Sequence, residues 1–265
     1  MFLILANAGD LVALQVANKL ALWQGREKVI FLSAEYLAQE TVWRYRQTSH
    51  DERTEIRLPE GRVIDCRDLS AVFNRLWQIT PPHFIAATEA DRLYATSEMF
   101  AFLLSWLSGL QCPVINPANP RALSGAPRNL TEWMKMAASA GLATRPLRLT
   151  SKVQSQSEPP ETDEITRRVL IVGGEITGES VDQWAGASTK NLIEGCRRLA
   201  QHSQADLIEA VFAQDGSAQW RLNWATTFPA SLSDPETESV ASWMEARAAT
   251  NVQQHLHQLS FTRGD

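Results

Sequence analysis

Two segments near the C-terminus carry the side chains with the clearest chemical meaning. The apolar run Ala205–Ala213 and the segment Gln219–Trp224 are separated by Gln-Asp-Gly-Ser, whose Asp-Gly pair favours positive φ, so together they predict a β-hairpin. An enzyme that handles nucleotide through magnesium would place two or three oxygen side chains on one side of such a hairpin, because this hard cation takes oxygen ligands. Of the positions expected there, Val211, Arg221 and Asn223, only Asn223 carries such an oxygen. The hairpin is therefore short of metal ligands.

Histidines and cysteines do not show the spacing of a metal site. His255 and His257 are two residues apart, which places them on different faces of a helix and favours a solvent-facing or partner-facing role. Cys66, Cys112 and Cys196 are far apart and odd in number, so neither a zinc site nor a disulfide framework is expected.

Other catalytic signatures are missing from the sequence. An α/β hydrolase or a nucleotide-sugar enzyme is not favoured, because Gly-x-Ser-x-Gly is absent and no Ser, His and acid arrangement stands out. The segment Asn7–Asp10 follows a buried strand but lacks the glycine spacing and the lysine of a phosphate-binding loop. We interpret it as a plain connection between a strand and a helix.

The composition is that of an ordinary globular protein. The chain has 265 residues, 44% hydrophobic and 21% charged, which is enough for two modest lobes with separate cores. A net charge of −5 and scattered arginines give no reason to expect nucleic acid. Met1–Ala6 lacks a basic flank, and Met99–Leu110 is too short to span a membrane and is interrupted by serines. We expect cytoplasmic residence without a membrane partner.

The first lobe, residues 1–128, begins as a strand, a helix and a second strand. Phe2–Ala6 and Val29–Leu32 are apolar runs, and Leu11–Trp23 between them has helical periodicity with Asp10 as its N-cap and Trp23 on its inward face. This order predicts a parallel pair joined by a right-handed crossover. The remaining predicted elements are the hairpin Thr54–Leu58 with Arg62–Asp65, the strand Ala71–Arg75, the helix Thr88–Leu110, which carries Leu93, Phe100, Leu103, Leu104 and Leu107, and the strand Cys112–Pro117.

The second lobe, residues 129–265, contains the polar segment 151–166, which has a Pro-Pro pair and almost no apolar residues and is interpreted as a linker. Around it the sequence predicts a helix over Asn129–Ala140 followed by a strand over Leu142–Thr150, a Gly-Gly hairpin over Arg168–Thr177, a helix over Thr189–His202, the hairpin Ala205–Trp224, and a helix beginning at Ser233–Glu236 and continuing toward Leu259.

The order of these pieces resembles the ATP-grasp ligases, in particular the branch with the peptide maturases that close ester and amide rings in ribosomally made peptides and the ligases that add glutamate to protein tails. Four segments carry the resemblance: AVFNRLW at Ala71–Trp77, VINPANPRAL at Val114–Leu123, Glu132–Ser151 and Leu192–Pro229. It implies an α/β fold class, in which a pre-ATP-grasp-like parallel α/β lobe is followed by a truncated ATP-grasp-like α+β lobe.

Two departures from the family pattern concern the nucleotide site. A typical member inserts a lid subdomain with phosphate-binding lysines where this chain has the polar segment with Lys152 as its only lysine. The family pattern has an aspartate at the position of Val211 and a glutamate at that of Arg221, and it keeps Asn223. Arginine would repel magnesium and valine offers no oxygen. The resemblance therefore implies the fold without its metal and nucleotide site, and no cofactor is expected.

Two functions remain open. The first is a non-catalytic pseudoenzyme that binds a peptide or partner enzyme in a peptide-modification or natural-product pathway, because arginines can take carboxylates in bidentate fashion and exposed tryptophans can anchor a partner. Core packing is the alternative role for the two tryptophans. The candidate partner-binding residues are Asn74, Arg75, Trp77, Arg221, Asn223 and Trp224.

The second function is a divergent ATP-dependent ligase that joins a carboxylate to an amine or a hydroxyl. It would need ATP and magnesium, with a metal site rebuilt from Asp206, Glu209, Asp215 and Glu175. For the helix Pro235–Leu259 two roles are open: a homodimer or docking contact with Trp243 and Met244 exposed, or packing in the core.

Overall fold

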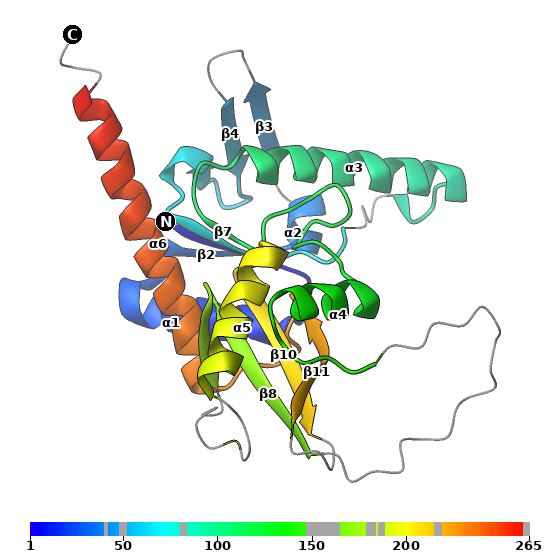
Figure 1. Ribbon diagram of the computed structural model, residues 1–265. Helices are drawn as coiled ribbons and strands as arrows, with labels where there is room; N and C mark the ends of the chain where they lie inside the picture. The colour runs from blue at the N-terminus through cyan, green and yellow to red at the C-terminus, as the bar shows by residue number, and fades with distance from the viewer. Residues whose placement is uncertain are drawn as a thin grey trace. The chain divides into compact units, whose positions relative to one another are not determined.

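The computed structural model describes residues 1–39, 42–47, 52–79, 84–146, 165–178, 184, 189–214 and 219–261. Contacts divide the chain into two compact units, Met1–Ala126 with Ala230–Asp265, and Pro127–Pro229. This division differs from the expected one, which placed residues 230–265 with the second lobe. Figure 1 shows the mixed α/β architecture that we expected.

The first unit is built on a four-stranded parallel sheet in the order β2-β1-β6-β7. Asp10 caps α1, since its Oδ1 accepts a hydrogen bond from the Ala13 amide at 3.0 Å. The predicted strand–helix–strand start is confirmed. The elements of this sheet and its first helix are β1 (Phe2–Ala6), α1 (Leu11–Gln24), β2 (Val29–Ser33), β6 (Ala71–Arg75) and β7 (Val114–Ile115).

A separate antiparallel sheet, in the order β3-β4-β5, belongs to the same unit. The hairpin of β4 and β5 was predicted and β3 was not, because the charged side chains of β3 hide its alternation. The remaining elements of the unit are η1 (Arg26–Lys28), α2 (Ala34–Gln39), β3 (Val42–Gln47), β4 (Glu52–Arg57), β5 (Val63–Asp65), η2 (Cys66–Asp68), α3 (Glu89–Gly109) and α6 (Asp234–Phe261).

Helix α6 packs along α1, which explains why it belongs to the first unit (Figure 1). Lys19 Nζ lies 2.9 Å from Glu238 Oε1, and Gln24 Nε2 donates to Glu245 Oε1 at 2.7 Å. Met244 of α6 is fully buried, so this residue follows the core-packed alternative.

The prediction that Trp23 lies on the inward face of α1 is wrong, because this residue is 42% exposed. In α3, Leu93 is 63% exposed. The buried side chains of α3, Leu103, Trp106 and Leu107, all lie in its C-terminal half. The apolar pattern of the first half of α3 therefore does not mark a core face within the described part of this unit.

The second unit contains an antiparallel sheet in the order β11-β10-β8-β9, so both predicted hairpins are confirmed. Residues 165 and 166, assigned to the linker, are in β8, and the rest of that linker lies outside the described residues. The described part of Leu142–Thr150 forms only a bridge from Thr144 to Leu222. The elements are α4 (Leu130–Ser139), β8 (Ile165–Val172), β9 (Glu175–Gly178), α5 (Thr189–Ser203), β10 (Leu207–Gln214) and β11 (Trp220–Thr226).

The core of the second unit lies between one face of this sheet and the helices α4 and α5. Phe212 and Ile171 from the sheet pack in one cluster with Trp133 of α4 and with Cys196 and Leu199 of α5. Asn129 begins α4 with a capping box, because its side chain accepts from the Glu132 amide and the Glu132 carboxylate accepts from the Asn129 amide.

The buried thiol of Cys196 links stability to pH. Burial raises the pKa of this thiol from its ordinary value of about 9 to about 12. Above about pH 9 the unfolded chain therefore releases a proton that the folded chain keeps, and the free energy of unfolding falls as the pH rises toward 12. We expect the stability difference between wild type and Cys196→Ala to shrink from pH 8 to pH 10 in urea unfolding. Parallel pH profiles of the two proteins would contradict this.

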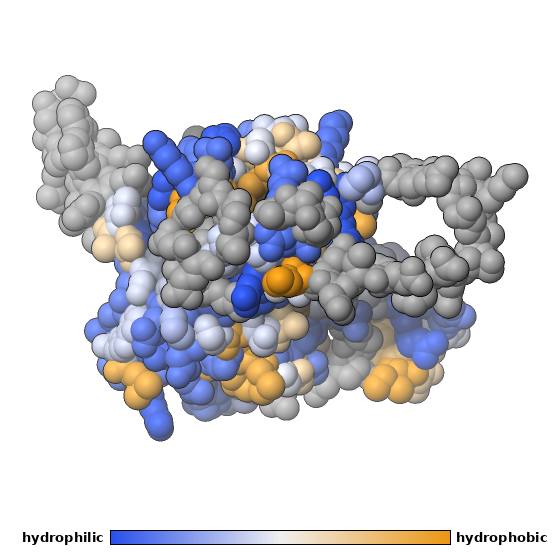
Figure 2. Space-filling view, turned by 60° about the horizontal axis from the view of Figure 1, so that its bottom comes forward, coloured by the Kyte–Doolittle hydropathy of each residue, from blue (hydrophilic) through white to orange (hydrophobic). Residues whose placement is uncertain are grey.

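On the face shown in Figure 2, apolar residues form several separate groups among hydrophilic ones. Scattered exposed apolar residues are usual for globular proteins. Among the described residues, no helix is long and apolar enough to cross a membrane.

Candidate functional site

One face of the second unit's sheet is turned away from α4 and α5. Side chains alternate along a strand, so the core residue Phe212 leaves its neighbours Val211 and Ala213 on the opposite face. In the strand register, Val211 lies opposite Arg168 of β8 and Trp224 of β11, and Ala213 lies opposite Arg221. We call the set Arg168, Glu209, Val211, Arg221 and Trp224 the arginine face.

A β-bulge interrupts the hairpin at the arginine face. The pairing passes from Val211–Trp224 to Phe212–Leu222, so Asn223 is the extra residue. The Asn223 Oδ1 accepts a hydrogen bond from Arg145 Nη1 at 3.0 Å. The oxygen that the sequence offered as a metal ligand is therefore engaged by a guanidinium group.

A carboxylate on the arginine face is also engaged. Arg168 Nε donates to Glu209 Oε1 at 2.7 Å, and Glu209 is only 7% exposed. Arg221 is partly exposed and Trp224 is 39% exposed. The described residues thus place two guanidinium groups, of Arg168 and Arg221, and the ring of Trp224 around Val211 on this face of the sheet. Such a surface suits an anionic group, because guanidinium binds carboxylate and phosphate.

The carboxylates proposed for a rebuilt metal site have different surroundings. Glu175 is exposed and its Oε2 accepts from Arg197 Nη2 at 2.9 Å, whereas Glu209 binds Arg168. Asp206 directly precedes β10, and Asp215 lies outside the described residues. Within the described ranges, no group of three or more His, Cys, Asp or Glu side chains is placed to hold a metal ion.

In the first unit, Asn7 bridges the carboxyl ends of β1 and β6. The chain leaves β1 toward β2 on one side, while β6 lies on the other, so this is a topological switch point, where open α/β sheets commonly bind ligands. Asn7 Nδ2 donates to the Gln78 carbonyl at 2.7 Å, and its Oδ1 accepts from the Trp77 amide at 2.8 Å. These bonds hold the segment after β6 against the end of β1.

Two of the candidate residues in this unit are buried. Asn74 Nδ2 donates to the Leu123 carbonyl at 2.6 Å. Arg75 Nε donates to Asp10 Oδ2 at 2.7 Å, and the two side chains are 4% and 9% exposed. Desolvation lowers the pKa of Arg75, and the bond to Asp10 opposes this shift. Both residues therefore stabilise this end of the sheet, and their proposed role as partner contacts has no exposed surface to act through.

Trp77 differs from these neighbours because its side chain is 68% exposed. Its backbone amide donates to Asn7 Oδ1, so the exposed ring projects from a backbone position that is tied to the end of β1. Sequence reasoning did not identify Asn7, Arg145 or Arg168 as parts of these sites. The alternation in β8 could have placed Arg168 on a sheet face, but its partner Glu209 depends on a register that local patterns do not show.

The sequence matches no protein-family model and no curated protein. The fold, however, is similar to several solved structures. A RiPP-associated ATP-grasp ligase from Chryseobacterium gregarium, solved with ADP and a leader and core peptide, superposes with a TM-score of 0.69 at 12% identity, over 92% of this chain and 96% of that one. The macrocyclase MdnC from Microcystis aeruginosa MRC, bound with its precursor peptide MdnA, gives 0.66 at 11% identity, over 92% and 98%.

A third similar structure is the ATP-grasp ligase PsnB with a minimal precursor, Mg and ADP, at a TM-score of 0.63 and 10% identity, over 94% of this chain and 98% of that one. The chain therefore has an ATP-grasp ligase-like fold. At these identities the likeness shows the fold, and the chemistry of the site has to be argued from this chain's own residues.

Proposed function

We propose that this chain is a non-catalytic ATP-grasp-like protein that binds a peptide, or a partner enzyme through a peptide segment, in a peptide-modification pathway. The observation that carries the proposal is the ion pair between Arg168 and Glu209 beside Val211. In this ion pair Arg168 engages the carboxylate of Glu209, on the face where the family pattern implies a metal site. The three similar structures support the choice of a peptide, since they were solved with leader, core or precursor peptides.

Electrostatics on the arginine face favour an anion over a divalent cation. Arg145 and Arg168 already contact the two oxygen-bearing side chains Asn223 and Glu209. A magnesium ion would have to displace both guanidinium groups and would still lie near Arg221, so repulsion would add to the loss of two hydrogen bonds. Without a bound magnesium ion, such a fold would lack one means of holding the phosphates of ATP, which favours a non-catalytic role.

The chemistry of the face also indicates which peptides would bind. Arg221 can take a carboxylate side chain, and Trp224 offers apolar surface beside the core of the hairpin. We propose that the arginine face binds a segment in which an acidic residue is followed or preceded by an apolar one. Trp77 is proposed as a second, independent contact in the first unit.

Charge reversal of Arg221 tests this proposal. The probe is a fluorescein-labelled peptide with repeated Glu-Leu pairs, compared with the same peptide carrying Gln for Glu. We expect Arg221→Glu to weaken binding of the Glu peptide by about tenfold, which corresponds to about 1.4 kcal/mol, and to leave the Gln peptide nearly unchanged. Fluorescence anisotropy at two salt concentrations measures both affinities.

The matched control is Arg167→Glu. Arg167 precedes Arg168 and lies opposite Phe212 in the register, so its side chain leaves β8 on the other face. Equal losses of affinity from the Arg167 and Arg221 substitutions would mean that net charge, and not the arginine face, controls binding.

Calorimetry with ATP and magnesium tests the alternative function, an ATP-dependent ligase. Tight magnesium-dependent binding of ATP, or release of ADP when an acceptor is added, would show a ligase and exclude the non-catalytic role.

A further inference from the structure

Strand β11 contributes two groups to the arginine face, Arg221 and Trp224, which lie three residues apart. In a regular strand, residues three apart point to opposite faces of the sheet. The bulge at Asn223 adds one residue between them, so the two side chains leave the strand on the same face. The arginine face therefore combines a guanidinium group with an aromatic ring because of this one irregularity.

The burial pattern of β11 supports this interpretation. Trp220, Leu222 and Ala225 belong to the core cluster of the second unit, so the spacing of core positions changes from two residues to three at the bulge. Trp224 is 39% exposed and pairs with Val211 of the arginine face. Without the extra residue, Trp224 would lie two positions after Leu222 in an unbroken alternation and would share its core face.

Residues 143–145 support the bulge from the edge of β11 that does not face β10. The Leu222 amide donates to the Ala143 carbonyl at 2.8 Å, and the Arg145 amide donates to the Leu222 carbonyl at 3.3 Å. The Arg145 side chain adds the bond to Asn223, in which Nη1 donates to Oδ1 at 3.0 Å. A charged donor makes this bond stronger than one between neutral groups. The side chain of the extra residue therefore fixes where the bulge lies.

We propose that Arg145 is a positioning residue for peptide selection on the arginine face. By holding Asn223 as the extra residue, it keeps Trp224 beside Arg221. A segment whose carboxylate binds Arg221 then presents its neighbouring apolar side chain to the indole ring. When the bond to Asn223 is lost, the extra residue can move along β11, and registers that turn Trp224 away from this face become populated.

This inference rests on the proposed peptide-binding function. It assigns the preference for an apolar residue beside the acidic one to a guanidinium group that lies outside the arginine face and acts through Asn223. Substitution of Arg145 is therefore expected to change which peptide is preferred, and substitution of Arg221 is expected to change how tightly acidic peptides bind.

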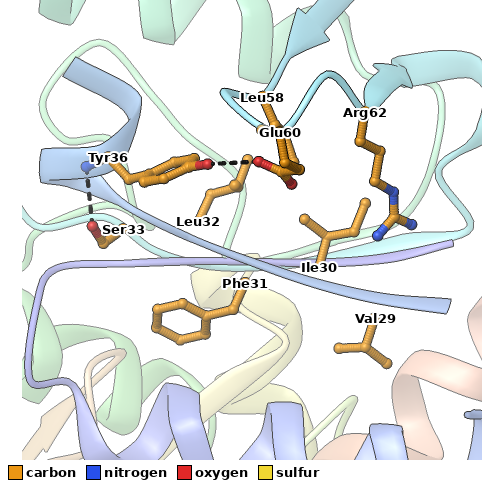
Figure 3. A pocket seen from close by; sticks show the side chains of 9 residues that line it. All are labelled: Val29, Ile30, Phe31, Leu32, Ser33, Tyr36, Leu58, Glu60 and Arg62. Atoms are coloured by element: carbon orange, nitrogen blue, oxygen red, sulfur yellow. Dashed lines mark hydrogen bonds between the residues drawn. The ribbon is translucent and has the colours of Figure 1, made fainter. Parts of the chain in front are cut away.

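A pocket of about 460 Å³ beside β2 in the first unit offers less to such a peptide (Figure 3). Three of its apolar lining residues are at most 5% exposed: Ile30, Leu32 and Leu58. Its Glu60 carboxylate accepts from the Tyr36 hydroxyl at 3.0 Å, and its Arg62 donates from Nη2 to the Glu27 carbonyl at 3.0 Å. The arginine face is therefore the better candidate for a segment that is both acidic and apolar.

Peptide preference, and not affinity alone, tests the role of Arg145. The probes are fluorescein-labelled peptides with repeated Glu-Leu pairs and with repeated Glu-Ser pairs, and anisotropy measures their binding to the full chain. We expect wild type to prefer the Glu-Leu peptide by about tenfold. Arg145→Met should reduce this preference to about threefold or less, because the ring of Trp224 is no longer held beside Arg221.

Two substitutions of Asn223 address the same bond from its other side. Asn223→Ala removes the acceptor and should reduce the preference for the Glu-Leu peptide as Arg145→Met does. Asn223→Asp keeps an oxygen that accepts from Arg145 and should keep the preference, even where the added charge weakens binding of both acidic peptides. Loss of the preference in Asn223→Asp alone would overturn the positioning role.

Two comparisons separate positioning from charge and stability. In a Trp224→Ala background, Arg145→Met should leave the remaining preference unchanged, because the ring through which Arg145 acts is gone. Arg198→Met is the matched control: it removes the same charge from a group whose Nε donates to the Ala140 carbonyl at 2.8 Å, and it should keep the wild-type preference. Equal losses of affinity for the two peptides in Arg145→Met would overturn the positioning role.

The positioning role and the proposed function fail separately. If Arg221→Glu weakens binding of the Glu-Leu peptide while Arg145→Met leaves the preference unchanged, the positioning role is wrong and the proposed function stands. The positioning role is also wrong if wild type binds the Glu-Leu and Glu-Ser peptides equally. If wild type binds neither peptide, the proposed function loses its support as well.

Discussion

Asp10→Ala is expected to lower the free energy of unfolding by about 3–5 kcal/mol, because it removes the carboxylate partner of a buried guanidinium group. Asp10 Oδ2 accepts from Arg75 Nε at 2.7 Å, and both side chains are almost fully buried. The same carboxylate caps α1 through the Ala13 amide. One substitution therefore removes a buried ion pair and an N-cap that by itself contributes about 1 kcal/mol.

Two companion variants separate these effects in urea unfolding followed by circular dichroism. Asp10→Asn keeps an oxygen for the cap but loses the charge, so an intermediate loss is expected. The double variant Asp10→Asn, Arg75→Met removes both charges from the interior and should be more stable than the sum of its single variants predicts, because neither charge is left buried alone. If the loss of unfolding free energy in the double variant equals the sum of the losses in the two single variants, Asp10 and Arg75 are not coupled.

The elements of the first unit could largely be predicted because their signals are local. The apolar run Phe2–Ala6, the cap Asp10 and the turn at Pro59–Gly61 each lie within a few residues of the structure that they specify. Strand β3 was missed since its charged residues resemble a solvated loop. Trp23 was misplaced because an apolar helical position marks a core face only when another element covers it.

The candidate site was less accessible to sequence reasoning because it depends on register and burial. Arg168 and Glu209 are 41 residues apart and meet only through the pairing of β8 with β10. Asn74 and Arg75 are polar residues at the end of a strand, a pattern that serves equally for an exposed contact and for a buried structural bond. Their partners, the Leu123 carbonyl and Asp10, decide between these roles, and neither is indicated by the local sequence.

Phe212→Ala should cost about 3–5 kcal/mol of unfolding free energy, as expected for removing a large buried ring. Phe212 is fully buried, and the centroid of its ring lies 5.8 Å from the centroid of the Trp184 ring in an edge-on arrangement. The preceding residue provides the matched control. Val211 lies on the arginine face and is not fully buried, so Val211→Ala should cost well under half as much.

The comparison of these neighbours also tests the assignment of the two sheet faces, on which the proposed function depends. If Phe212 lies in the core and Val211 lies on the arginine face, Phe212→Ala lowers the unfolding midpoint, and Val211→Ala leaves stability and the affinity for the Glu-Leu peptide close to wild type. The reverse ranking would mean that β10 is shifted by one residue, because such a shift exchanges the two faces of a strand. Glu209 and Val211 of β10 would then face the core, and the arginine face as defined would not exist.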